Sequence, residues 1–416
     1  MNRPLIRPQR PTTEADAAQP VTACTAAPRP RRRPWLISTV AGLLGFLALL
    51  VTTLMTVPIP ATAAALGTLA IDGALELTLL LLVCCTAVAL LARRRRARPA
   101  AALAAGGALL MLVMTVVPAG ALWRTAEAEG VQLSATRYLG QGLTHGAERP
   151  AGAETHTYAT ADGEALKLDR LPAHGGGSHR PAMVYVHGGG WKIGDRADGY
   201  AWGGWFNDRG YDVFTIDYRL LPHADWRSGV GDVKAAVGWV RDNADRFGVD
   251  PARITLFGES AGGHLALMAA YTEGDPMFPP TTPHRDTSVR TVLNFYGTTD
   301  FDDVTANAAA PGLIRQATQE YIGGTKAQHP DRWHASSPVH HVRPGLPATL
   351  SIHGEDDRLI PVSQMHRLDK ALTDSGVAHR SVELPWSSHL FDLTRGNLAT
   401  QISAGVVEQF QQRYAH

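Results

Sequence analysis

Three long apolar runs before residue 125 constrain this chain of 416 residues more than any other feature. The first, Trp35 to about Val57, carries no charged residue. A helix of that length, rising about 1.5 Å per residue, spans the ~30 Å hydrocarbon core of a bilayer. A cleaved signal peptide has a shorter apolar core that begins nearer the terminus. The sequence therefore predicts a membrane span here.

Two further apolar runs are also long enough to span a bilayer. The second covers about Gly73 to Ala92 and ends at a row of arginines, and the third covers about Ala100 to Leu122. Asp72 and Glu76 lie at the start of the second run, and acidic groups deep in lipid are costly. Their nearness to the end of the run favours the outer interface, while an intramembrane site is the alternative.

Arginine clusters predict the side of the membrane on which each end of the chain lies. They flank the start of the first run and fill the loop between the second and third, whereas residues 58–68 carry no charge. Positive residues favour the cytoplasmic side, so both Arg-rich segments are expected there. Three spans then put everything after Trp123 outside the cytoplasm. This topology explains the basic arm better than a nucleic-acid contact does, and it predicts a multi-pass protein of the cell membrane.

Composition predicts how the rest of the chain is divided. Residues 1–34 are rich in Pro, Thr, Ala and Arg without a hydrophobic period, which is typical of a disordered arm. Residues 35–124 hold the spans, 125–158 form a linker and lead-in strand, and 159–416 form a globular domain. All three cysteines precede residue 100, which excludes a disulfide framework in that domain. A formal net charge of +1 argues against a general nucleic-acid binder.

Short strand-like runs alternate with helical patterns along the globular part. The runs are MVYV, YDVFTIDY, RITLFG, VRTVLNFYG, ATLSIHG and HRSVELP. Residues 229–247 and 261–271 have helical patterns. Buried strands alternating with helices are typical of a doubly wound, mostly parallel sheet. The sequence thus predicts an α/β fold preceded by an all-α membrane region.

Two glycine-rich motifs carry the clearest chemistry. GESAG at 258–262 lies between a strand-like run and a helical pattern. A serine at such a turn is exposed on a strained backbone, and the flanking glycines remove Cβ atoms that would clash. HGGGW at 187–191 follows an upstream strand, and its glycines let N–H groups point into a site that holds an oxyanion. The G-x-G-x-x-G spacing of a dinucleotide site is missing.

A nucleophilic serine also needs a base and an orienting acid downstream. Residues 355–357 (Glu-Asp-Asp) follow the run ATLSIHG, and His389 follows the run HRSVELP. The carboxyl ends of parallel strands meet at one edge of a sheet, so these side chains are expected to lie together. Of the seventeen histidines, His389 alone has both this order and this location.

Six blocks occur in the order that is typical of the hormone-sensitive-lipase-like esterases of the α/β-hydrolase superfamily, which this chain resembles from about residue 150 to 416. They are His187-Gly-Gly-Gly-Trp, Asp217-Tyr-Arg-Leu, Asp250-Pro-x-Arg-Ile, Gly258-x-Ser-Ala-Gly-Gly, His353-Gly-x-x-Asp-x-x-Ile-Pro and the late His389. The membrane-spanning front is a departure, because typical members of the family are soluble. The resemblance implies an α/β-hydrolase fold and the cleavage of carboxylic esters.

The resemblance also implies a role for each matching residue. Ser260 is the implied nucleophile, and His389 is the base that takes its proton. Asp357 rather than Asp356 is the implied acid, because it stands three residues before Ile360. The implied oxyanion hole is formed by the N–H groups of Gly189, Gly190 and Ala261.

We therefore predict a membrane-anchored serine hydrolase that cleaves carboxylic esters through an acyl-enzyme intermediate. The mechanism needs neither a metal nor an organic cofactor. The expected partners are a small-molecule or lipid ester and the membrane, with no nucleic acid. An acyltransferase or peptidase would use the same triad, and a catalytically silent binding module would share the fold. The motifs leave the acyl length and the oligomeric state open.

Other residues near these motifs have structural interpretations. Asp217 is expected to fix a turn, and Glu259 is expected at the surface or behind the nucleophile. The insertion at 298–347 either covers the site or adds peripheral helices. An aromatic group either lines an acyl pocket or belongs to the core, and it comprises Trp191, Trp202, Trp205 and Phe206.

Overall fold

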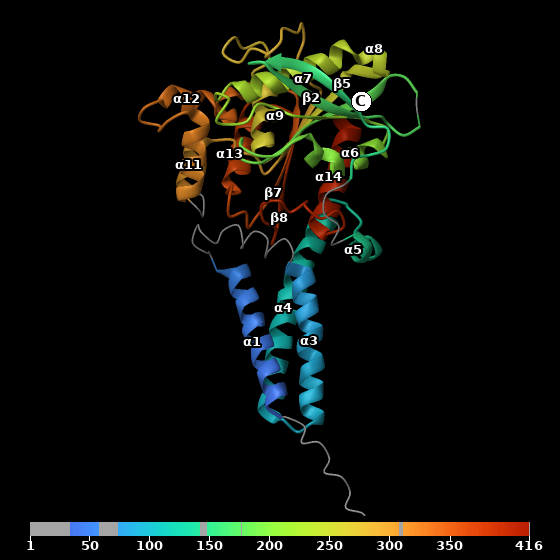
Figure 1. Ribbon diagram of the computed structural model, residues 1–416, viewed down its shortest axis with the longest axis vertical. Helices are drawn as coiled ribbons and strands as arrows, with labels where there is room; N and C mark the ends of the chain where they lie inside the picture. The colour runs from blue at the N-terminus through green and yellow to red at the C-terminus, as the bar shows by residue number, and fades with distance from the viewer. Residues whose placement is uncertain (1–33, 58–73, 142–147, 176, 308–310, 416) are drawn as a thin grey trace, which may run out of the picture.

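The computed structural model describes residues 34–57, 74–141, 148–175, 177–307 and 311–415. Asp72 and nearly all of the predicted N-terminal arm lie outside these residues. Figure 1 shows the two parts of the molecule, a bundle of three long helices and an α/β domain at one end of the bundle.

The three long helices coincide with the three apolar runs. They are α1 (Pro34–Thr56), α3 (Ala74–Arg94) and α4 (Arg98–Ala128). Each is long and apolar enough to cross a membrane. The third is longer than predicted, because it continues past Leu122 to Ala128. Its last turns are held by packing, since Leu122 and Ala126 enter a core of the α/β domain.

Two apolar clusters hold the bundle together, one near each end. Ile37, Ala41, Ala92, Ala100 and Ala104 form the cluster far from the domain. The cluster next to the domain has mostly larger side chains and comprises Ala48, Val51, Met55, Leu81, Met111 and Met114. The Arg-rich turn between α3 and α4 lies at the far end, so that turn and the domain stand at opposite ends of the bundle (Figure 1).

The α/β domain is built on one eight-stranded sheet. Its strands are β1 (Glu154–Ala161), β2 (Glu164–Leu171), β3 (Arg180–Val186), β4 (Asp212–Ile216), β5 (Val249–Glu259), β6 (Thr291–Phe295), β7 (Ala348–Gly354) and β8 (His379–Leu384). Their spatial order is β1-β2-β4-β3-β5-β6-β7-β8, antiparallel from β1 to β4 and parallel thereafter. The predicted mostly parallel sheet is confirmed. Where the sequence predicts one lead-in strand, the structure has a hairpin of β1 and β2.

Helices cover both faces of the sheet and create two cores. One face carries α7 (Ser228–Asp242), α8 (Ala244–Phe247), α9 (Ala261–Tyr271) and α13 (Ser363–Asp374), and the other carries α6 (Tyr200–Asn207) and α14 (Leu398–Tyr414). Because side chains of a strand alternate between faces, β3 contributes Val184 to the first core and Tyr185 to the second. The single helix predicted over 229–247 is interrupted at Asn243, whose backbone is not helical.

The segment predicted as a linker packs against the domain after the bundle ends. A short helix, α5 (Ala135–Gln141), follows α4. Between them, Ser134 and Gln401 of α14 exchange hydrogen bonds of 2.7 and 3.2 Å. The Arg380 guanidinium also pairs with Glu129. These contacts fix the end of α4 to the domain.

The predicted insertion lies between β6 and β7. It holds α10 (Phe301–Asn307), α11 (Pro311–Ile322), α12 (Pro330–Ala335) and the 3-10 helix η3 (Pro338–His341). A second 3-10 helix, η2 (Arg196–Gly199), follows the first glycine motif. In Figure 1, α11 stands at one side of the domain with its first turn toward the level of the bundle.

Candidate active site

Ser260 occupies a sharp turn between β5 and α9. Its φ of 54° and ψ of −120° lie outside the regions that L residues ordinarily adopt. Ser260 N donates to Phe295 O at 2.9 Å, which ties the turn to β6. A Cβ on Gly258 would lie 2.1 Å from Gly262 O, and one on Gly262 would lie 2.1 Å from Val186 O. Only glycine fits at these two positions, so the GESAG motif holds the serine out at the carboxyl edge of the sheet.

Asp357, His389 and Ser260 form a continuous hydrogen-bonded chain. His389 Nε2 lies 2.9 Å from Ser260 Oγ, and His389 Nδ1 lies 2.7 Å from Asp357 Oδ2. With the proton on Nδ1, the ring donates to the carboxylate and accepts the serine hydroxyl proton. This is the arrangement in which a histidine can act as base toward a serine.

Asp357 is held as a carboxylate by its surroundings. Its Oδ1 accepts hydrogen bonds from Leu359 N and Ile360 N, both at 2.9 Å. Its Oδ2 also lies 3.3 Å from His353 Nε2. Burial alone would raise the pKa of Asp357, but the His389 ring and the hydrogen bonds from His353 and His389 hold it below its usual value. The residue is therefore a charged acceptor at neutral pH.

The two acidic residues that precede Asp357 lie in different surroundings. Burial raises the pKa of Asp356, the opposite direction to that of Asp357. The backbone N–H of Asp356 donates to Ser387 O at 3.0 Å, and that of Glu355 donates to Leu384 O at 2.9 Å. These bonds join the loop after β7 to the loop after β8, so the acid and the histidine are positioned together.

The first glycine motif lies directly against Ser260. A Cβ on Gly188 would lie 3.3 Å from Ser260 Cβ. Gly189 has a φ of +103°, and a Cβ there would lie 2.1 Å from Ile193 O. Lys192 N and Ile193 N both donate to Gly189 O, at 3.1 and 3.2 Å, which closes the loop into a turn. The loop that carries Gly189 and Gly190 thus begins against Ser260, and Ala261 follows Ser260 in the chain.

Sequence reasoning missed a carboxyl pair beside Ser260. Glu259 hydrogen-bonds Asp392, and both burial and the Asp392 charge raise the pKa of Glu259. Asp392 accepts from Tyr296 Oη at 2.6 Å and from Trp202 Nε1 at 2.8 Å. The Tyr296 ring centroid lies 4.6 Å from that of His389. Glu259 therefore lies behind Ser260. Its partner Asp392 could have been suspected only because it comes three residues after His389.

The aromatic residues near the first glycine motif separate into two groups. Trp202 and Phe206 belong to the core on the α6 and α14 face. Trp191 packs on the other face and stacks on Tyr321 of α11, with 4.3 Å between ring centroids. The choice between pocket and core is therefore decided in favour of the core for Trp191, Trp202 and Phe206, and Trp205 is partly buried against the core on the α6 and α14 face.

His264 and Asp217 hold loops near the site. Burial lowers the pKa of His264 to about 4, so its ring is neutral. It accepts from Trp191 Nε1 at 3.3 Å and donates to Ser336 O at 2.8 Å, which links the glycine motif to the insertion. Asp217 accepts from Arg196 N at 3.0 Å and Arg196 Nη1 at 2.6 Å, and so fixes the loop that carries η2.

Comparisons with known proteins give the fold and the kind of chemistry. A family model described as BD-FAE matches residues 169–372. Esterase LipC of Mycobacterium tuberculosis is 37% identical over 222 residues, which cover 52% of this chain and 54% of the relative. Esterase LipQ of the same organism is 32% identical, over 59% of this chain and 58% of the relative. The chain thus spans about half the length of the curated relatives it matches.

Solved structures agree with these matches. The apo form of Thermogutta terrifontis esterase 2 superposes with a TM-score of 0.54 at 27% identity, covering 64% of this chain and 96% of that one. The domain therefore has the predicted α/β-hydrolase fold. The comparisons support the esterase family that the motifs resemble. They also support a carboxylesterase-like hydrolase as the kind of enzyme.

Proposed function

We propose that this protein is a membrane-anchored serine hydrolase that cleaves carboxylic esters, with Ser260, His389 and Asp357 as its triad. The observation that carries the proposal is the position of the His389 ring, 2.9 Å from Ser260 Oγ on one side and 2.7 Å from Asp357 Oδ2 on the other. The esterases LipC and LipQ among its relatives support the choice of ester bonds.

In the proposed mechanism, Ser260 Oγ attacks the ester carbonyl while His389 Nε2 takes the hydroxyl proton. Collapse of the tetrahedral intermediate breaks the bond to the alcohol oxygen, and His389 returns the proton to that oxygen. Water then attacks the acyl-enzyme with the same base, which releases the acid and restores the serine. Asp357 keeps the ring oriented and stabilises its charged form.

The oxyanion is assigned to the backbone N–H groups of Gly189, Gly190 and Ala261. The support for this assignment is the close approach of the glycine motif to Ser260 and the positive φ of Gly189 and Gly190. Donors of this kind are fixed before the substrate arrives, and removal of one costs roughly 10²–10³ in turnover.

The anchoring proposal rests on the three apolar helices. The Arg-rich turn between α3 and α4 and the α/β domain stand at opposite ends of the bundle. Because basic residues favour the cytoplasmic side, the catalytic domain is assigned to the outer face of the cell membrane.

The test uses the full-length protein in detergent and p-nitrophenyl butyrate as substrate. Ser260→Ala is expected to abolish hydrolysis while its melting temperature stays close to that of the parent. The matched control is Ser375→Ala, at the end of α13 and remote from the triad, which should keep full activity. Hydrolysis by Ser260→Ala at the parent rate would refute the proposal.

A further inference from the structure

The catalytic edge of the sheet faces the helical bundle. Asp357 follows β7 and His389 follows β8, and the carboxyl ends of these parallel strands point to the same edge. Figure 1 shows the lower ends of β7 and β8 directed toward the end of the bundle. The bundle and the reacting groups therefore lie on the same side of the domain.

The loop of the acid is bonded to the end of α1. Arg358, next to Asp357, is buried, and its Nη2 donates to Met55 O at 3.2 Å. Met55 lies in the last turn of α1, where carbonyl groups lack partners within the helix. A guanidinium there satisfies such a carbonyl and complements the negative end of the helix dipole.

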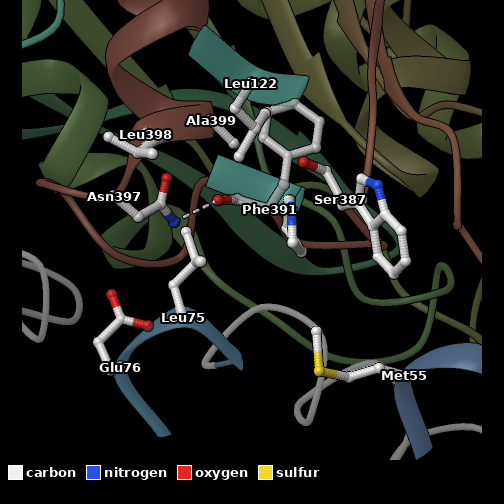
Figure 2. A pocket seen from close by; sticks show the side chains of 11 residues that line it. Met55, Leu75, Glu76, Leu122, Ser387, Phe391, Asn397, Leu398 and Ala399 are labelled. Carbon is white, nitrogen blue, oxygen red and sulfur yellow. Dashed lines mark hydrogen bonds between the residues drawn. The ribbon is translucent and has the colours of Figure 1, made fainter. Parts of the chain in front are cut away.

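The loop of the histidine packs on the same end of the bundle. Trp386, three residues before His389, packs against the cluster that contains Met55 and Met114. Figure 2 shows the space between the two parts, with Met55, Leu75 and Glu76 on one side and Ser387 and Phe391 on the other. That space is only about 30 Å³, room for a water molecule or two. The domain is thus seated on the bundle.

Exposed apolar side chains surround this edge. Among the described residues that follow α4, the large apolar side chains that are exposed are Leu139 (83%), Ile193 (70%), Leu313 (51%), Met277 (48%) and Leu393 (40%). Ile193 and Leu393 lie in loops that follow the carboxyl ends of β3 and β8.

The remaining members of this group sort by the side of the domain on which they lie. Leu139 is on α5, beside the end of the bundle, and Leu313 is in the first turn of α11, which points to the same level (Figure 1). Met277 alone lies at the opposite edge, in the loop between α9 and β6. Single exposed apolar residues are ordinary, but these four lie on the side where the bundle ends.

The depth of the catalytic edge in the bilayer then indicates the kind of substrate. The hydrocarbon core is about 30 Å thick within a bilayer of about 40–45 Å, so the interfacial layer on each side is only several ångströms deep. With α1 as a membrane span, its end lies at the boundary of the core. Three hydrogen bonds and the peptide link between Asp357 and Arg358 connect that end to Ser260 through His389. Ester groups of membrane amphiphiles lie at this same boundary.

We propose, on the basis of the esterase activity proposed above, that the site acts on acyl esters of amphiphiles that reside in the outer leaflet of its own membrane. Leu139, Ile193, Leu313 and Leu393, here called the apolar rim, contact that leaflet and hold the catalytic edge at the depth of the ester groups. The apolar helices then serve to present the site to its substrate as well as to anchor it.

The test uses the full-length protein reconstituted in phosphatidylcholine vesicles with 4-methylumbelliferyl oleate as the probe. The oleate ester is placed either in the same vesicles as the protein or in separate, protein-free vesicles. We expect the same-vesicle rate to exceed the separate-vesicle rate by roughly tenfold or more, because a shared surface raises the effective concentration. Equal rates in the two arms would overturn the inference.

Rim variants provide the second measurement. The double variant Leu139→Glu, Leu313→Glu is expected to lower same-vesicle hydrolysis of the oleate ester by roughly tenfold, since each leucine loses apolar burial in the leaflet. Met277→Glu, at the opposite edge, is the matched control and should leave that rate unchanged. Hydrolysis of p-nitrophenyl acetate, a soluble ester, should stay within about twofold in all three proteins.

The two proposals fail in different ways. If p-nitrophenyl acetate is cleaved normally but the rim double variant behaves as the Met277→Glu control does on the oleate ester, the membrane-substrate inference is wrong and the esterase proposal stands. If Ser260→Ala still cleaves p-nitrophenyl acetate, the esterase proposal is wrong.

Discussion

Ser260 and its two hydrogen-bonded partners, His389 and Asp357, are supported differently in this molecule. Ser260 is held within the domain, through its hydrogen bond to Phe295 of β6 and the close packing of Gly258 and Gly262. Asp357 and His389 lie on loops that also contact the helical bundle, through Arg358 and Trp386. The position of Ser260 thus depends on contacts within the domain, whereas the positions of Asp357 and His389 also depend on how the domain sits on the bundle.

The largest loss of activity is expected when Asp357, the proposed acid, is replaced. Asp357→Asn removes the charged acceptor of the His389 Nδ1 proton, so the ring loses the tautomer that it needs. We expect kcat on p-nitrophenyl butyrate to fall by roughly 10⁴-fold.

Asp356→Asn is the matched control for this experiment. Its side chain is adjacent in sequence, and its backbone makes the bond to Ser387 that any residue could make. Less than about tenfold loss is expected for it. A larger loss in Asp356→Asn than in Asp357→Asn would reverse the assignment of the acid.

An intermediate effect is expected where the bundle meets the acid loop. Arg358→Met keeps the length of the side chain but removes the hydrogen bond to Met55 O. A bond from a charged donor contributes about 1.5–3 kcal/mol, so a loss of roughly tenfold in kcat is expected if part of it positions Asp357.

The control for Arg358→Met is Lys370→Met on α13, whose ammonium pairs with Asp374 at the surface. It should behave as the parent does. The rate at which a fluorophosphonate probe labels Arg358→Met should fall by the same factor as kcat. An unchanged kcat in Arg358→Met would show that the acid loop keeps its geometry without the bundle.

The smallest effect concerns the carboxyl pair formed by Glu259 and Asp392. Because the pKa of Glu259 is raised in the folded protein, the folded state keeps a proton that the unfolded state releases as pH rises. The free energy of unfolding of the parent should therefore fall between pH 5 and pH 8 relative to Glu259→Gln, which has no such proton. Melting temperatures should diverge by about 3 °C over this range, with the variant the more stable at pH 8. A constant difference would contradict the raised pKa.

Local patterns were sufficient to predict the sheet and to choose the residues of the candidate site. The prediction of the site rests on short-range sequence, namely a serine between a strand and a helix, and an acid and a histidine after later strands. It also rests on the rule that the carboxyl ends of parallel strands share an edge. The sequence predicted only one lead-in strand where the structure has the hairpin of β1 and β2. The pairing of this hairpin with the sheet depends on its register with β4, which short-range sequence does not indicate. The continuation of α4 to Ala128 was missed because tertiary packing of Ala126 stabilises that polar turn.

Contacts between distant segments could not be predicted from the sequence. The pairing of Glu259 with Asp392 and the bond from Arg358 to Met55 each join residues whose spacing carries no motif. Such contacts follow from the packed structure, and they decide how the bundle and the catalytic edge meet.

The central claim is that the hydroxyl at position 260 is the reactive nucleophile of the protein. The most direct measurement is to label the full-length protein with a fluorophosphonate and to map the modified peptide by mass spectrometry. We expect one adduct, on Ser260, whose formation is slowed in Asp357→Asn. An adduct on another residue, or no adduct in a folded preparation, would contradict it.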